Sequence, residues 1–218
     1  MRSRRSALLI GPLPIDGDVI GGTKVSFAAL VSALQADTAF TVTVHDTSRP
    51  RAGKGRIARA LLDFSALVRL AGALADPRRR FDVIMLNTSS GGALKSGPLV
   101  WAVCRLRRVP LVVRVFGGDL DLFFDAASRP VRALAARTIL RAELVLLQTR
   151  GLCARFAGSA RVEWFPTTRD VRVQRVRAVR EPRFLFLGQL RREKGIVETV
   201  DAARNLPDGA TLTVCGPA

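Results

Sequence analysis

The sequence predicts a doubly wound α/β domain followed by the beginning of a second α/β domain. Short apolar runs alternate with segments of helical periodicity along most of the chain. The apolar runs are continuous, which is typical of parallel strands that are buried on both faces. A new strand–helix–strand unit begins at Arg183, late in the chain of 218 residues, after a stretch rich in arginine. We therefore expect a first domain over residues 1–168, a basic linker over residues 169–182 and an incomplete second domain over residues 183–218.

Six apolar runs are expected to form the strands of the first domain, and five segments its helices. The strands, in chain order, are Ala7–Ile10, Phe40–Val44, Phe81–Leu86, Val109–Phe116, Leu144–Gln148 and Arg161–Phe165. The helices are Thr23–Leu34, Ile57–Ala71, Leu99–Leu106, Val131–Leu140 and Gly151–Phe156. In the second of these helices, apolar residues recur at spacings of three and four, which is typical of an amphipathic helix.

The second domain is expected to contain a strand over Arg183–Gly188, a helix over Gly195–Leu206 and a strand over Thr211–Cys215. A unit of this size cannot cover its own sheet. We therefore expect it to be the start of a larger domain.

The chain is strongly basic, with a formal net charge of +17. Three interpretations of this charge stay open: biased arginine usage on a solvated surface, a patch for anionic lipids or an acidic acceptor, and nucleic-acid binding. Arginine is spread along the chain, and no interleaving of aromatic and basic residues of the kind that stacks bases is present. Specific nucleic-acid binding is therefore the least favoured.

The cysteines and the first residues both favour a cytoplasmic protein. Three widely spaced cysteines and one histidine form neither a CxxC motif nor a metal-ligand spacing, so we expect no disulfide framework and no metal site. The first apolar run is broken by Gly11 and Pro12 and is followed by Asp16, which favours a buried strand over a signal peptide. No apolar run reaches the roughly 18–20 residues of a membrane span. Any membrane contact would then be peripheral, on the inner face.

Three loops of the first domain follow predicted strands, and ligands of open α/β sheets bind at those strand ends. Pro14–Ser26 places Gly21 and Gly22 directly before a helix, where backbone amides and the helix dipole favour a phosphate. The alternative for these two glycines is a plain tight turn.

Asn87–Gly92 is a polar loop suited to hydroxyl groups, or else an ordinary solvent loop. The third loop joins Phe116 to Gly117, Gly118 and Asp119, and its carboxylate either contacts a sugar hydroxyl or caps the next helix.

The fourth loop opens the second domain. Gly188 and Gln189 end the strand, and three cations then crowd the approach to a helix that begins at Gly195: Arg191, Arg192 and Lys194. Cations at a helix N-terminus oppose the helix dipole unless an anion lies between them. The loop therefore predicts a diphosphate site, and the alternative is a solvated run of charge.

The pattern strand–G–Q–L–x–x–E–K–G–I, followed by a helix and a strand that ends in C-G-P, resembles the opening of the C-terminal domain of retaining GT-B glycosyltransferases. These are the family 4-like enzymes, the glycosyl transferases of group 1. The Gly-Gly loop before the first helix and the glycine-rich loop after Phe116 also look like theirs. The resemblance spans the chain, and Gly188–Gly195 is its most specific part.

The resemblance implies two Rossmann-like domains with a nucleotide-diphosphate sugar as donor substrate, and no metal or other cofactor. It implies a donor-diphosphate set of Gly21, Gly22, Gln189, Arg191 and Lys194, and an acceptor-side set of Asn87, Phe116, Gly117, Gly118 and Asp119. It assigns no catalytic residue in this chain.

The sequence departs from the family at three points. Gln189 stands where the family has an arginine, and Phe116 stands where many members have a histidine. The E-x7-E motif of the family is absent from the chain. We therefore expect an amino-terminal fragment that is inactive by itself.

The expected function of the intact enzyme is transfer of a hexose or related sugar to a carbohydrate or lipid-linked acceptor in polysaccharide or glycolipid synthesis. The alternative is a non-catalytic α/β module that binds nucleotides or anionic surfaces.

Overall fold

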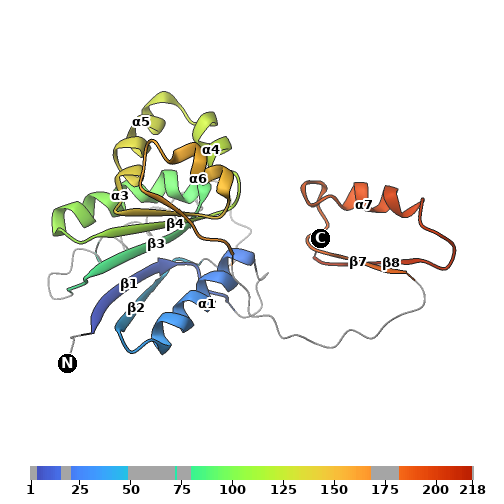
Figure 1. The fold of residues 1–218 in the computed structure, drawn as a ribbon, viewed down its shortest axis with the longest axis horizontal. Coiled ribbons are helices and arrows are strands. Elements are labelled where there is room, and N and C mark those ends of the chain that lie inside the picture. Colours follow the sequence, from blue (N-terminus) through green and yellow to red (C-terminus); the bar gives the residue numbers. More distant parts are fainter. Residues whose placement is uncertain (1–3, 16–20, 49–71, 73–79, 168–181, 218) are drawn as a thin grey trace. The chain divides into compact units, whose positions relative to one another are not determined.

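The computed structural model describes residues 4–15, 21–48, 72, 80–167 and 182–217. The chain divides into two compact units, Met1–Asp170 and Val171–Ala218, and each is described by itself (Figure 1). The predicted helix Ile57–Ala71 lies outside the described residues. So does the predicted linker, apart from Pro182.

Unit 1 is built on a six-stranded sheet in the order β2-β1-β3-β4-β5-β6, with every pair of neighbouring strands parallel. The strands are β1 (Arg5–Gly11), β2 (Phe40–Asp46), β3 (Val83–Ser89), β4 (Leu111–Phe116), β5 (Leu144–Leu147) and β6 (Val162–Trp164). Each contains a strand core that the apolar runs predicted. The predicted doubly wound fold class is confirmed.

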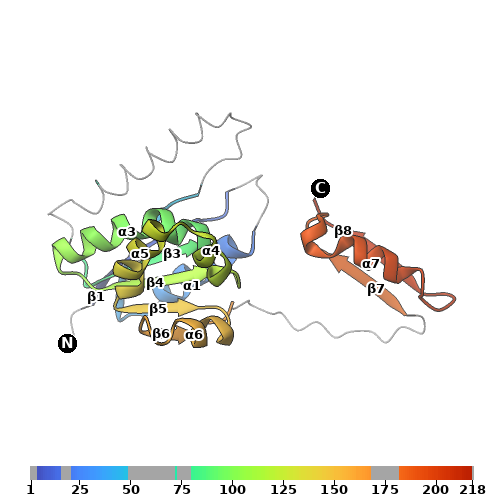
Figure 2. The ribbon, with the colours of Figure 1, turned by 90° about the horizontal axis from the view of Figure 1, so that it is seen from above.

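Helices lie on both faces of this sheet (Figure 1). α1 (Gly22–Ala36) covers one face at β1, β2 and β3. The opposite face carries α3 (Ser90–Arg107), α4 (Leu120–Ala126), α5 (Arg129–Arg137), a 3₁₀ turn η1 (Ile139–Arg141) and α6 (Arg150–Phe156). Figure 2 shows α3 running along β3 and β4, which it contacts, and α5 packs against α3 and η1.

Alternate residues of β1 supply the two cores, as the two-residue period of a strand requires. Leu8 and Ile10 join the large core under α3, and Leu9 joins the core under α1. Phe27 of α1 is fully buried against Leu9. Its ring lies over Gly11, where an added Cβ would approach the ring to 2.9 Å. Glycine at the end of β1 therefore lets α1 lie close to the sheet.

The prediction of a polar loop over Asn87–Gly92 is wrong. β3 continues through Asn87 to Ser89, and α3 begins at the next residue. Ser89 has extended backbone at the N-cap position, and its Oγ accepts a hydrogen bond from the Gly92 amide at 3.3 Å. The polar residues are thus a strand end and a helix cap rather than a loop.

The helices on this face also differ from the prediction in three ways. α3 starts nine residues before the predicted Leu99, because Gly97 and Pro98 are accommodated inside it. Gly97 lies against Ile139, where an added Cβ would come within 2.3 Å, so the position needs glycine for packing. α4, a short helix of seven residues, was not predicted. The predicted helix Val131–Leu140 divides into α5 and η1.

Asp46 ties the end of β2 to the chain that follows β1. Its carboxylate accepts hydrogen bonds from the Leu13 amide at 3.0 Å, the Ser48 amide at 2.8 Å and Ser48 Oγ at 2.7 Å. Partial burial raises the pKa of Asp46, but these hydrogen bonds and the charge of His45 outweigh it, so the net pKa is lowered.

A carboxyl group whose pKa is lowered by folding stabilises the protein above its unfolded pKa, and the contribution disappears as the pH falls through the folded pKa. We therefore expect Asp46→Asn to lower the unfolding free energy at pH 7 and to flatten its decline below about pH 4. Urea unfolding at a series of pH values measures both effects. An unchanged acid profile in the variant would contradict the assignment.

Unit 2 contains the predicted strand–helix–strand. β7 (Arg183–Leu187) and β8 (Thr211–Cys215) are parallel, and α7 (Ile196–Ala203) follows a 3₁₀ turn, η2 (Arg192–Lys194). Phe184 and Leu212 line a pocket together with residues of α7, so α7 covers that face. On the opposite face Leu185 is 62% exposed and Leu187 is 77% exposed. Within unit 2, no described element covers this second face.

Candidate functional site

The carboxyl ends of the unit 1 strands share one edge of the sheet, because all six strands are parallel. β1 lies between β2 and β3 in the sheet. The chain therefore passes from β1 to β2 on one side, and the connection from β2 to β3 crosses over β1 to the other side. Such a reversal of strand order is where open α/β sheets bind ligands. Gly11 ends β1 and Ser89 ends β3 at this point. Among the residues predicted for unit 1, Gly21 and Gly22 come after β1, Asn87 lies near the end of β3, and Phe116–Asp119 ends and follows β4.

Gly21 and Gly22 are at the amino end of α1, as predicted. Gly21 occupies the N-cap position with extended backbone (φ −81°, ψ 152°) and has no side chain to accept a hydrogen bond from the first turn. Phe27, five residues into the helix, packs over Gly11, so the helix start reaches beyond the strand end. The amide groups of this first turn can meet an anion at the sheet edge.

The turn after β4 holds Asp119 against the start of α3. Ser90 Oγ donates a hydrogen bond of 2.7 Å to Asp119 Oδ1. Asp119 is at the N-cap position of α4, but its side chain makes no capping hydrogen bond. The alternative capping role therefore does not describe its carboxylate. Gly117 has φ +104°, which only glycine adopts without strain, and Gly118 is exposed beside Thr149.

Gln148 braces this turn, and the sequence analysis missed it. Its Oε1 accepts a hydrogen bond of 2.6 Å from the Gly117 amide, and its Nε2 donates to Thr167 Oγ1. One side chain thereby joins the ends of β4, β5 and β6. Gln148 directly follows β5, so the same strand-end argument that selected Asp119 could have found it.

Asn87 and Phe116 are brought to the same edge, but both are buried. Asn87 is 2% exposed, its Nδ2 lies 3.5 Å from the Ile10 carbonyl, and its Oδ1 has no hydrogen-bond partner among the described residues. Phe116 is 4% exposed and lies over the guanidinium of Arg114 at 4.4 Å. Their predicted contact with an acceptor stays a prediction, and in this structure neither side chain is presented at the surface.

The loop of unit 2 is an ordered turn. The Gly188 amide donates to the Cys215 carbonyl at 3.0 Å, and the Leu190 amide donates to the Pro217 carbonyl at 2.9 Å. Gly188–Leu190 is therefore held beside the chain that leaves β8. An added Cβ at Gly216 would lie 1.6 Å from the Gly188 carbonyl oxygen, so this packing requires glycine.

The cations of this loop differ in their partners. Arg191 lies 3.7 Å from Glu193, in an ion pair whose two side chains are both about half exposed or more. Lys194 ends η2 and is exposed, and no ion pair is recorded for it within the described residues. Gly195 has φ +77° and forms the N-cap of α7. The turn thus places Lys194 next to the start of that helix.

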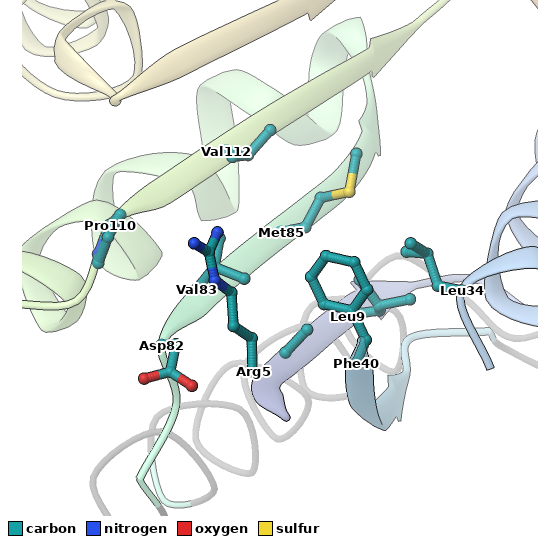
Figure 3. A pocket seen from close by; sticks show the side chains of 10 residues that line it. Arg5, Leu9, Leu34, Phe40, Asp82, Val83, Met85, Pro110 and Val112 are labelled. Carbon is teal, nitrogen blue, oxygen red and sulfur yellow. The ribbon is translucent and has the colours of Figure 1, made fainter. Parts of the chain in front are cut away.

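A pocket of about 850 Å³ lies on the α1 face of unit 1 (Figure 3). Its floor is apolar, with Met85 and Val112 among its lining residues, and the Arg5 side chain runs over Val83. Arg5 and Asp82 belong to the amino ends of the strands. The pocket is therefore at the edge opposite to the predicted site, and no predicted site residue lines it.

Within the described ranges, no group of three histidine, cysteine, aspartate or glutamate side chains is placed to hold a metal ion. None of the helices described is long and apolar enough to cross a membrane.

Comparisons with known proteins give a likeness of fold. No family model matches the chain, and no curated protein matches its sequence. Among solved structures, the crystal structure of UGT89C1 from Arabidopsis thaliana complexed with UDP-L-rhamnose is similar to it, with a TM-score of 0.52 and 11% sequence identity. The match covers 97% of this chain and 69% of that one. At this identity the likeness concerns the fold, and it agrees with the predicted fold class.

Proposed function

We propose that the chain is part of a glycosyltransferase that takes a sugar from a nucleotide-diphosphate donor, and that it is a family 4-like, retaining enzyme of the GT-B type. The observation that carries the proposal is the turn Gly188–Gly195, which places an exposed lysine at the start of α7. Its motif resembles the donor-binding loop of that family. The likeness of fold to a structure that holds UDP-L-rhamnose supports the nucleotide-sugar part of the proposal, and the family 4-like and retaining part rests on the motif alone.

The proposed chemistry is stabilisation of the leaving diphosphate. Lys194 supplies a positive charge beside the start of α7, and this charge offsets the charge that develops on the leaving diphosphate without a metal ion. Gly21 and Gly22 belong to the donor-diphosphate set that the family resemblance implies, and their amides are hydrogen-bond donors at the start of α1. Arg191 or Arg192 would have to supply the positive charge of the arginine that Gln189 replaces, and Arg191 lies 3.7 Å from Glu193. Asp119, Gly117 and Gly118 contact the acceptor in this proposal.

The proposed acceptor is a carbohydrate or a lipid-linked sugar in polysaccharide or glycolipid synthesis. The proposed location is cytoplasmic, and the net charge of +17 supports peripheral association with the anionic inner face of a membrane. Sedimentation with anionic vesicles checks the membrane part. Binding that does not weaken with added salt would contradict it.

The donor site is tested by Lys194→Ala. We expect this change to weaken binding of UDP or a UDP-sugar to the 218-residue chain about 10-fold or more, because it removes a charge-assisted hydrogen bond to the diphosphate. Isothermal titration calorimetry measures the affinities, and GDP- and dTDP-sugars are titrated in parallel.

Arg204→Ala is the matched control for Lys194→Ala. It removes one positive charge from the same unit at an exposed residue that lies 3.6 Å from Asp201, so we expect unchanged affinity. Equal affinity of Lys194→Ala and the wild type would overturn the assignment of Lys194. Binding of anionic vesicles with no binding of any nucleotide sugar would favour the non-catalytic module instead.

A further inference from the structure

Arg114 is a cation inside the sheet of unit 1. It is the fourth residue of β4, its side chain is 1% exposed, and it is among the largest fully buried side chains of the described residues. Nε, Nη1 and Nη2 have no hydrogen-bond partner within the part of the chain that the structure describes. Buried charged groups are normally paired and hydrogen-bonded, so an unsatisfied guanidinium needs an explanation.

Burial does not remove the charge. It lowers the pKa of Arg114 to about 10, which still leaves the guanidinium protonated at neutral pH. The nearest carboxylate in the same register is Glu163, which lies two strands away across Leu146 and forms no recorded ion pair with Arg114. The described residues therefore provide a fixed positive charge without a counter-charge.

Two aromatic rings lie close to the guanidinium. Its Cζ lies 4.4 Å from the ring centroid of Phe116 and 4.5 Å from that of Phe165. Such contacts stabilise the positive charge of the guanidinium. The rings do not, however, accept hydrogen bonds from the N–H groups, which lie in the guanidinium plane. The N–H groups point outward from the plane's edge in a fixed fork, and this fork matches the two oxygens of a carboxylate or a phosphate.

A second buried polar group lies on the neighbouring strand. Asn87 of β3 is in register with Arg114, so the two residues lie on the same face about 4.8 Å apart between strands. Asn87 Oδ1 is buried without a partner among the described residues, and it can accept a hydrogen bond from a hydroxyl. The pair thus offers donors for an oxyanion beside an acceptor for a hydroxyl group.

We propose that Arg114, with Asn87, forms a subsite for the oxyanion of a hydroxyl-bearing ligand, either a carboxylate or a phosphate. The guanidinium nitrogens expose essentially no surface, so a ligand reaches them only when a neighbouring side chain moves. Phe165 is the ring that can move, since it is only half-buried and follows the last residue of β6, whereas Phe116 is buried. An acidic or phosphorylated sugar fits this chemistry. That last identification rests on the proposed function, and the oxyanion subsite does not.

Trp164 provides a readout, because it directly precedes Phe165 and its Nε1 donates to the Gln148 carbonyl at 3.0 Å. The chain has two tryptophans, so Trp101→Phe leaves Trp164 as the single fluorophore. Inorganic phosphate, glucose 6-phosphate and glucuronate are titrated separately into this protein at constant ionic strength. We expect a saturable change in the Trp164 fluorescence with at least one of these ligands. Comparison of the three affinities decides between a phosphate and a carboxylate.

Arg114→Met should weaken this binding at least about 10-fold, and Arg114→Lys should fall in between because it keeps the charge but loses the fork. Arg155→Met is the matched control. Arg155 also lies over a phenylalanine ring, 5.6 Å from the centroid of Phe156, but its side chain is exposed. The ligand affinity of this variant should therefore equal that of the parent protein.

Thermal unfolding separates a binding role from a structural one. A buried cation without a partner is costly, so Arg114→Met should keep or raise the Tm while it loses the rise in Tm that the ligand gives the parent protein. Absence of saturable binding to the parent protein, or equal binding by Arg114→Met, would overturn the proposal. If Arg114→Met does not fold, the ligand affinity and the ligand-induced rise in Tm of Arg114→Lys test the proposal instead. Loss of nucleotide-sugar binding alone would leave this subsite standing, because no nucleotide enters the assay.

Discussion

Phe27→Ala is expected to lower the unfolding free energy of unit 1 by about 3–5 kcal/mol. The Phe27 ring is fully buried and packs with Leu9 and Val31 in the core under α1. Gly11 cannot fill the space that the ring leaves, so a cavity would remain between α1 and the sheet. Domains of this size are stable by only about 5–15 kcal/mol, so the loss is a large share of the total.

Urea unfolding followed by tryptophan fluorescence measures this effect in unit 1 alone, because both tryptophans, Trp101 and Trp164, belong to that unit. Phe123→Ala is the control, since the Phe123 side chain is 47% exposed on α4 and should cost less than about 1.5 kcal/mol. Equal losses in the two variants would mean that α1 does not depend on this ring for its packing.

The strands could be predicted because their signal is local. Continuous apolar runs such as Leu144–Leu147 follow from burial on both faces, and the structure confirms each of the eight strands within its described residues. The start of α3 could not be predicted in the same way. Ser89 and the glycines after it favour a loop by composition, and only the Ser89 cap and the contact of Gly97 with Ile139 make a helix there.

The sequence predicted which candidate site residues lie at the strand ends, but not which side chains contact one another there. Strand ends correctly placed Asp119 and Gly21 at one edge of the sheet, because the carboxyl ends of parallel strands meet there. The Ser90–Asp119 hydrogen bond and the Gln148 brace each join residues about 30 positions apart, namely 29 and 31. A local reading of sequence carries no information about such pairs. The burial of Arg114 was likewise hidden, because an arginine inside an apolar run gives no sign of the rings that enclose it.

The turn at Gly117 gives the second large effect. Gly117→Ala is expected to lower the unfolding free energy of unit 1 by about 2–4 kcal/mol, from backbone strain and the loss of the partly buried hydrogen bond between Ser90 and Asp119. The backbone has φ +104°, and a Cβ would lie 2.6 Å from Asp119 Oδ1, the atom that accepts from Ser90 Oγ. Gly118→Ala is the control, because its Cβ would meet only the Thr149 methyl at 3.6 Å, and we expect a change within about 0.5 kcal/mol.

A double-mutant cycle separates the two causes in Gly117→Ala. Asp119→Ala removes the oxygen that the new Cβ would strike, so the double variant should recover the steric part of the loss and keep the part due to φ. The expected coupling is about 1 kcal/mol or more in the direction of rescue. Additive losses would mean that the carboxylate moves aside at no cost, so that the turn does not fix its position. Asp119 would then be a flexible surface group, and its predicted role toward an acceptor would lose its geometric basis.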